Sequence, residues 1–76
     1  MLGLMQDRPL ALPHLFHRAE QLFGHKELIT ATADGEQRTT IAEWAVRVRR
    51  LATALDRLGI SADARVGTFC WNTAAH

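Results

Sequence analysis

The sequence predicts an α/β fold in which a helix, a β-hairpin, a long helix and a buried strand follow one another. Apolar residues recur three and four positions apart in two stretches, a spacing that is typical of amphipathic helices. The pair Asp34-Gly35 lies between β-branched residues, as in a tight hairpin. An almost uniformly apolar run, Val66 to Trp71, follows the second helical stretch and indicates the strand.

Residues 1–12 are apolar but have no period, and we expect an extended arm that lies on another surface. A domain then begins at residue 13 and continues to residue 76. Pro13 suits the first turn of a helix and Gly24 suits its end. The apolar stripe of this helix consists of Leu15, Phe16, Ala19, Leu22 and Phe23.

The long helix has the clearest signals in the chain. Thr40 and Glu43 match a capping box, so the helix is expected to begin at Ile41, and Gly59 provides a left-handed stop. Leu51 lies in the middle of its apolar stripe and is expected to be buried. The stripe comprises Ile41, Trp44, Ala45, Val48, Leu51, Ala52, Leu55 and Leu58.

The run from Val66 to Trp71 is too uniformly apolar for a strand with one face in water, and we expect it to be buried on both faces of a parallel sheet. A helix before such a strand is typical of a crossover in a larger sheet, for which this chain supplies too few strands. Asn72 then has the character of a helix cap.

Composition limits the possible functions. A chain of 76 residues forms at most one small domain, and its single cysteine, Cys70, has no partner for an internal disulfide, which favours a reducing, cytoplasmic location. The net charge of +1 gives no reason to expect nucleic acid or anionic lipid as a partner. No apolar run approaches the roughly 20 residues of a membrane span, and the N-terminus lacks the features of a signal peptide.

Three groups of residues deserve consideration as sites, and each has a simpler structural interpretation. His14 and His17 with Cys70 could hold a metal, but two histidines at this spacing are more often surface residues. Buried in a strand, the thiol would behave as a small hydrophobe, not a nucleophile.

The arginines of the long helix could bind phosphate, but interleaved acidic residues favour a solvated face. The two tryptophans could stack on a base, but both lie in core patterns, which favours packing. The arginines are Arg47, Arg50 and Arg57, and the tryptophans are Trp44 and Trp71.

The stretch "RTTIAEWAVRVRRLATALDRLGISADARVGTFCWN" resembles the N-terminal start of the adenylate-forming acyl-CoA synthetases, the superfamily that includes fatty-acid–CoA ligases and luciferases. The resemblance covers residues 12–76 and agrees in order, spacing and length with the family pattern of an "EW" helix, an "LGI" turn and an "RVG" strand. In that family the Asn after the strand opens a helix that continues further. The resemblance therefore implies a truncated N-terminal segment of the large domain.

The resemblance also implies a reaction for the complete enzyme: a fatty acid, ATP and magnesium give an acyl-adenylate, and the acyl group then passes to coenzyme A. The family's phosphate-binding loop, magnesium-positioning acid, ribose-binding Asp and catalytic Lys lie downstream. The chain is therefore expected to hold no catalytic, cofactor-binding or metal-binding residue and to be an inactive scaffold. Residues 1–12 could join a homodimer contact, as the arm does in some long-chain members.

An alternative from a different functional class is a small stand-alone α/β interaction module. In that case an exposed strand edge and the stripe of the first helix would bind a partner. A continuous reading frame beyond His76 would favour the enzyme, whereas a natural stop codon and a stable, monodisperse product would favour the module.

Overall fold

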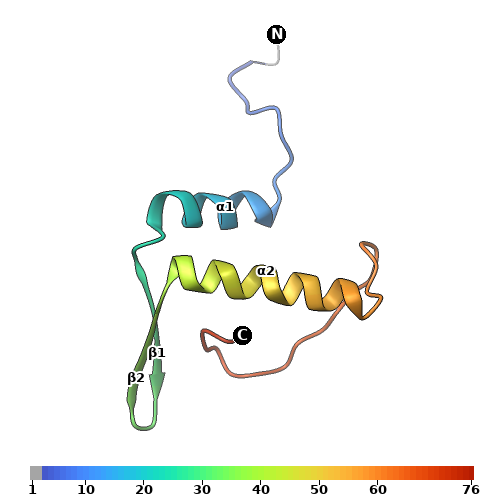
Figure 1. Ribbon diagram of the computed structural model, residues 1–76. Helices are drawn as coiled ribbons and strands as arrows, with labels where there is room; N and C mark the ends of the chain where they lie inside the picture. The colour runs from blue at the N-terminus through green and yellow to red at the C-terminus, as the bar shows by residue number, and fades with distance from the viewer. Residues whose placement is uncertain (1–2) are drawn as a thin grey trace.

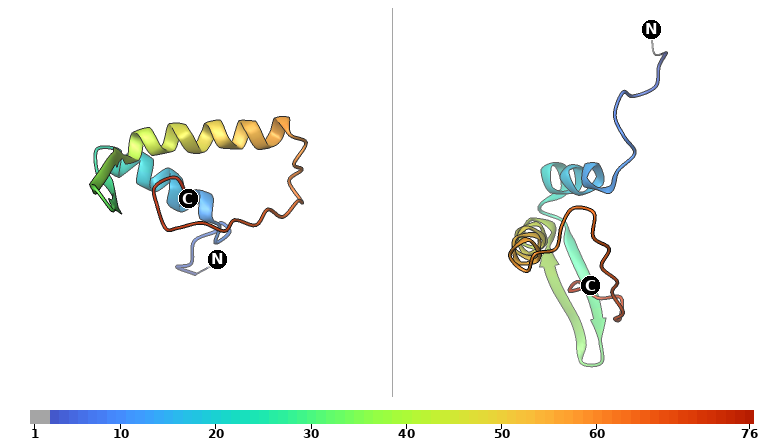
Figure 2. Two further views of the ribbon diagram at one scale, coloured as in Figure 1. Left: turned by 90° about the horizontal axis from the view of Figure 1, so that it is seen from below. Right: turned by 90° about the vertical axis from the view of Figure 1, so that its right-hand side faces the viewer.

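The computed structural model describes residues 3–76 and, in that range, has two helices and one two-stranded sheet. The helix α1 packs against α2, the hairpin projects from one end of the pair, and the segment after α2 returns beneath it (Figures 1 and 2). The expected order of helix, hairpin and long helix is confirmed. The elements are α1 (Leu12–Phe23), β1 (Glu27–Thr32), β2 (Gly35–Thr40) and α2 (Ile41–Arg57).

The first turn of α2 is closed by the predicted capping box. The Thr40 hydroxyl accepts a hydrogen bond from the backbone N–H of Glu43 at 3.1 Å, and the Glu43 carboxylate accepts one from the N–H of Thr40 at 3.1 Å. The Thr39 hydroxyl also donates to this carboxylate, at 2.8 Å. Backbone groups that a helix start would leave without partners are thereby satisfied, and the helix begins at Ile41 as predicted.

The same turn is bonded to the link between α1 and β1. Ile41 N–H donates to the carbonyl of Lys26 at 2.9 Å, and Ala42 N–H donates to the carbonyl of Gly24 at 3.0 Å. A Cβ atom at Gly24 would lie 3.0 Å from the Glu20 carbonyl oxygen and 3.6 Å from the Ala42 side chain. The tight contact is therefore with the last turn of α1 itself, whereas the distance to Ala42 is an ordinary van der Waals contact.

The other end of α2 closes on a left-handed glycine. Gly59 has φ of +81°. Its N–H donates to the carbonyl of Asp56 at 3.0 Å, and the N–H of Ile60 donates to the carbonyl of Leu55 at 3.1 Å. This pair of bonds is the Schellman arrangement, so the predicted stop at Gly59 is confirmed.

The hairpin forms at the predicted place. Strands β1 and β2 pair antiparallel in a register that runs from Glu27 opposite Thr40 to Thr32 opposite Gly35. Residues 33 and 34 make the connection, and Gly35 adopts φ of +135°, a backbone conformation that other residues rarely adopt.

The predicted buried strand from Val66 to Trp71 is wrong for this structure. The segment has no regular secondary structure, and the side chains of Phe69 and Trp71 are fully or almost fully exposed. A strand requires a neighbour whose N–H and C=O groups face it. Within residues 3–76 the only paired strands are β1 and β2, so the run finds no ladder. The expectation that Cys70 is buried in that strand fails with it, because its side chain is exposed.

The predicted burial of Leu51 is also wrong: its side chain is 59% exposed. The apolar stripe of α2 is wider than the surface that α1 covers, and Leu58 is likewise exposed. Among residues 3–76 only Ala45, at 0% exposure, and Thr30, at 6%, are buried. Apolar periodicity identified the helix correctly, but the number of elements available to cover it decides burial.

The helix expected after Asn72 does not begin within the described residues. Thr73 N–H donates to the Trp71 carbonyl at 2.9 Å, and His76 N–H donates to the Thr73 carbonyl at 3.1 Å. These bonds span two and three residues, as in short turns, and not the four residues of an α-helical bond.

Removal of the capping hydroxyl should destabilise α2. We expect Thr40→Ala to lower the free energy of unfolding by about 0.5–2 kcal/mol, because the N–H of Glu43 loses its acceptor. Thr53→Ala is the matched control, since Thr53 lies inside the same helix and its hydroxyl only donates to the carbonyl of Arg49. The free energy of unfolding of both variants is measured by denaturant unfolding of the protein that contains this segment. Equal losses in the two variants would contradict the capping role.

Candidate functional site

A charged and aromatic cluster joins α1 to α2. Both terminal nitrogens of Arg49 donate to the two carboxylate oxygens of Glu20, which lies 29 positions earlier in the chain. The guanidinium carbon of Arg49 lies 5.3 Å from the centre of the Phe16 ring. The Phe16 ring is in turn 5.3 Å from the ring of Trp44, tilted by 55°. The cluster therefore combines a bidentate ion pair with a cation–π contact and an aromatic pair.

The two charged groups of the cluster stabilise each other's ionised forms. The hydrogen bonds from Arg49 hold the pKa of Glu20 below its ordinary value; desolvation opposes this less strongly, and the charge of Arg49 adds a further, smaller lowering. The hydrogen bond to Glu20 raises the pKa of Arg49. The side chains remain 51% exposed at Arg49 and 27% exposed at Glu20, so water screens much of the attraction. The pair is therefore expected to contribute little net stability to the packing of α1 on α2.

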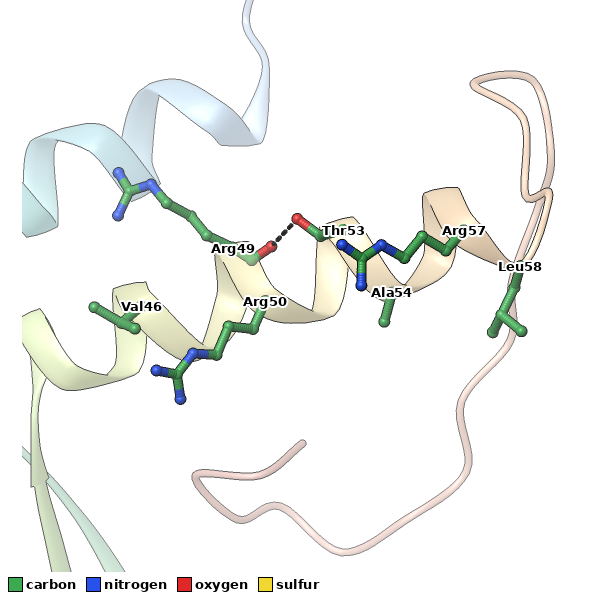
Figure 3. A pocket seen from close by; sticks show the side chains of 7 residues that line it. All are labelled: Val46, Arg49, Arg50, Thr53, Ala54, Arg57 and Leu58. Carbon is green, nitrogen blue, oxygen red and sulfur yellow. Dashed lines mark hydrogen bonds between the residues drawn. The ribbon is translucent and has the colours of Figure 1, made fainter.

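A shallow hollow with several arginines runs along the outward side of α2 (Figure 3). Arg50 and Arg57 both line it, whereas Arg47 lies in a separate hollow beside Trp44 and the C-terminal turn. The arginines that the sequence places on one side are thus divided between two hollows. The residues of the outward hollow are Val46, Arg49, Arg50, Thr53, Ala54, Arg57 and Leu58.

The outward hollow has little that would fix an anion. Arg50 and Arg57 are exposed, and Arg49 points toward α1, where it is occupied by Glu20 (Figure 3). The Thr53 hydroxyl donates to the Arg49 carbonyl at 3.1 Å and so faces its own helix. Exposed arginines on one helix face have the properties of a solvated surface, the interpretation that the sequence favoured.

The candidate metal ligands are not brought together. His14 and His17 lie in α1 and line one hollow at the base of the N-terminal arm, while Cys70 lies in the exposed segment after α2. Within residues 3–76 no three His, Cys, Asp or Glu side chains are grouped closely enough to hold a metal ion.

The two tryptophans have different surroundings. Trp44 is partly buried against Phe16, as the packing interpretation predicts. Trp71 is 88% exposed, so its predicted place in a core is wrong for this structure.

In the part of the chain that the structure describes, neither helix has the length and apolarity to cross a bilayer.

Comparison with known proteins identifies relatives over the whole chain. It is 36% identical over 77 residues to a 3-methylmercaptopropionyl-CoA ligase of Ruegeria lacuscaerulensis and 32% identical over 77 residues to a medium-chain-fatty-acid–CoA ligase of Ectopseudomonas oleovorans. It is 41% identical over 73 residues, 95% of the chain, to a long-chain-fatty-acid–CoA ligase of Thermus thermophilus. This chain belongs to the acyl-CoA ligases.

The chain spans 14% of the length of each of these ligases, so it corresponds to a small part of them. No family model and no solved structure matches it. The family resemblance predicted from the sequence is confirmed.

Two contacts in this ligase segment were not predicted from the sequence. The pairing of Glu20 with Arg49 has no local signature, since either residue alone is typical of an exposed helix face. The hydrogen bond from the Ala74 N–H to the Thr30 hydroxyl, at 3.0 Å, joins residues 44 positions apart. For this second contact the sequence offers one weak indication: Thr30 carries a hydroxyl in a predicted strand, beside the apolar Ile29.

The ion pair predicts a pH dependence of stability in this ligase segment. The folded protein holds the pKa of Glu20 below the 4.5 of a free glutamate, so the stabilisation is complete well above pH 4.5 and is lost as pH falls through the depressed value. We expect Glu20→Gln to weaken the acid sensitivity of thermal unfolding between neutral pH and about pH 3.5.

Asp63→Asn serves as the control for the loss of one carboxylate, because Asp63 is exposed and makes no ion pair within residues 3–76. Identical melting-temperature profiles for the Glu20 and Asp63 variants would contradict the linkage.

Proposed function

We propose that this chain is a scaffold segment in the large N-terminal domain of an ATP-dependent fatty-acid–CoA ligase. The observation that carries the proposal is the match along the whole chain to three acyl-CoA ligases, two of which are named for fatty acids. The exposed arginines of the outward hollow are compatible with a supporting role.

In the proposed reaction of the complete enzyme, a carboxylate oxygen of the fatty acid attacks the α-phosphorus of ATP, and pyrophosphate leaves with the bonding electrons. The sulfur of coenzyme A then attacks the acyl carbon, and AMP leaves. Magnesium and a lysine would offset the negative charge that develops on the phosphate in the first step. We place the residues for these steps outside this chain, so that residues 1–76 contribute no catalytic group.

The scaffold role follows from the apolar surface that remains exposed. Val66, Phe69 and Trp71 present apolar side chains along one segment, and Leu51 lies beside the same return of the chain, in a hollow with Trp44 and the C-terminal turn. Burial of apolar surface contributes roughly 25 cal/mol per Å². We propose that the remainder of the ligase polypeptide covers this surface.

The proposal also covers the division of the segment into an arm and a domain start, a homodimer contact of the arm, and the cellular location. We assign residues 1–12 to an arm and residues 13–76 to the start of the domain, with a homodimer contact as the role of the arm. Residues 4, 5 and 10 of the arm carry exposed apolar side chains, which such a contact would cover. A cytoplasmic location fits the free thiol of Cys70.

Activity should require the longer polypeptide. We expect a full-length ligase that contains this segment to release pyrophosphate from ATP and a fatty acid and to form acyl-CoA, and the 76-residue chain to do neither. Both are assayed after removal of contaminating ligases. Turnover by the short chain would contradict the scaffold assignment, and a stop codon after His76 with a stable monodisperse product would favour the interaction module instead.

Substitution of Phe69 tests whether the exposed segment is covered in the longer protein. If it is, Phe69→Ala should lower the free energy of unfolding of the full-length ligase by about 3–5 kcal/mol, the usual cost of truncating a buried phenylalanine. Leu58→Ala is the control, because Leu58 is also exposed in this structure but lies on the outward hollow of α2. A loss for Phe69→Ala no larger than that for Leu58→Ala would mean that the segment remains in water.

A further inference from the structure

Thr30 is the one buried residue with a polar side chain in the range 3–76, with 6% of its surface exposed. It lies in β1, and its hydroxyl oxygen accepts a hydrogen bond from the backbone N–H of Ala74 at 3.0 Å. This contact joins the hairpin to the C-terminal turn. No buried side-chain polar atom in the described range lacks a hydrogen-bond partner, so the burial of Thr30 is compensated.

The hydrogen bond between Ala74 and Thr30 fixes the end of the segment that follows α2. The segment from Ile60 to Trp71 has only turns and no strand pairing, and it runs from the far end of α2 back to the hairpin (Figures 1 and 2). One end of the segment is fixed by the bonds around Gly59. The other end is fixed on β1 by the hydroxyl of Thr30.

The surroundings of the bond are partly apolar. Leu28 and Trp44 line the same hollow as Thr30, together with Asn72 and Ala74. The Ala74 N–H is part-buried, and a buried N–H that loses its acceptor carries a desolvation cost, so the Thr30 hydroxyl stabilises the turn at this position. Leu28 and Ile29 of β1 line the same hollow, but their side chains have no polar atom, so Thr30 is the residue of β1 in this hollow whose side chain offers an acceptor to the turn.

We propose that Thr30 is a positioning residue that latches the C-terminal turn to β1 and thereby sets where Val66 to Trp71 presents its apolar side chains. The proposal rests on the proposed function only for the identity of the surface that this segment packs against. The latch itself requires a single hydroxyl acceptor at position 30. Serine retains that acceptor, whereas valine keeps the shape of threonine and removes it.

Hydrogen exchange of the full-length ligase tests the latch directly. In Thr30→Val, the peptide that contains Ala74 should exchange its amide protons roughly tenfold faster than in the wild type, because the Ala74 N–H loses its acceptor. Thr30→Ser should restore slow exchange. Thr32→Val is the matched control, since the Thr32 hydroxyl bonds only within the hairpin, to the Gly35 carbonyl at 3.1 Å, and should leave the Ala74 peptide unchanged.

Exchange in a peptide from the middle of α2 serves as the internal reference for global unfolding. Faster exchange confined to the Ala74 peptide in Thr30→Val, with rescue by serine, supports the latch whether or not the protein proves to be a fatty-acid–CoA ligase. Equal exchange of that peptide in wild type and Thr30→Val overturns it. If Thr30→Val unfolds, Thr30→Ser decides the matter alone: slow exchange supports the latch and fast exchange overturns it.

Discussion

The fold depends on the first turn of α2, where three parts of the chain meet. The N–H groups of Ile41 and Ala42 bond to carbonyls in the link between α1 and β1, and the N–H of Glu43 bonds to the hydroxyl at the end of β2. A helix start normally leaves such donors without partners inside the helix. Here they instead tie α1, the hairpin and α2 together. The angle of α2 relative to both neighbours follows from this turn more than from the few buried side chains.

Local signals in the sequence predicted the elements that depend on neighbours a few residues away. The capping box at Thr40 and Glu43, the left-handed Gly59 and the hairpin turn at residues 33 and 34 involve partners within five positions, and each is present in the structure. Such features carry their own hydrogen-bond partners. The sequence alone therefore suffices to place them.

The wrong predictions share the opposite property. Burial of Leu51 and formation of a strand at Val66 to Trp71 both require other elements to pack or pair with these residues. The apolar character of a residue shows only that its burial is favourable, not that a packing partner is present. The pairing of Glu20 with Arg49 was not predicted for a related reason. The two residues are 29 positions apart and meet only because the hydrogen bonds at the first turn of α2 already align α1 with α2. Long-range contacts are consequences of the fold, and no local pattern in the sequence encodes them.

Hydrogen bonding and apolar burial reach different degrees of completion in this molecule. Buried side-chain polar atoms in residues 3–76 all have partners, and both ends of α2 are capped, yet Ala45 is the sole buried apolar residue in that range. On folding, polar groups exchange hydrogen bonds with water for hydrogen bonds within the protein, so each bond contributes little net stability. Apolar burial is the main favourable contribution to folding. The capped and paired backbone specifies the conformation of the segment, and burial of its apolar face must come from outside these residues. A segment organised in this way has its shape defined locally and depends on further contacts for its stability, as the proposed scaffold role requires.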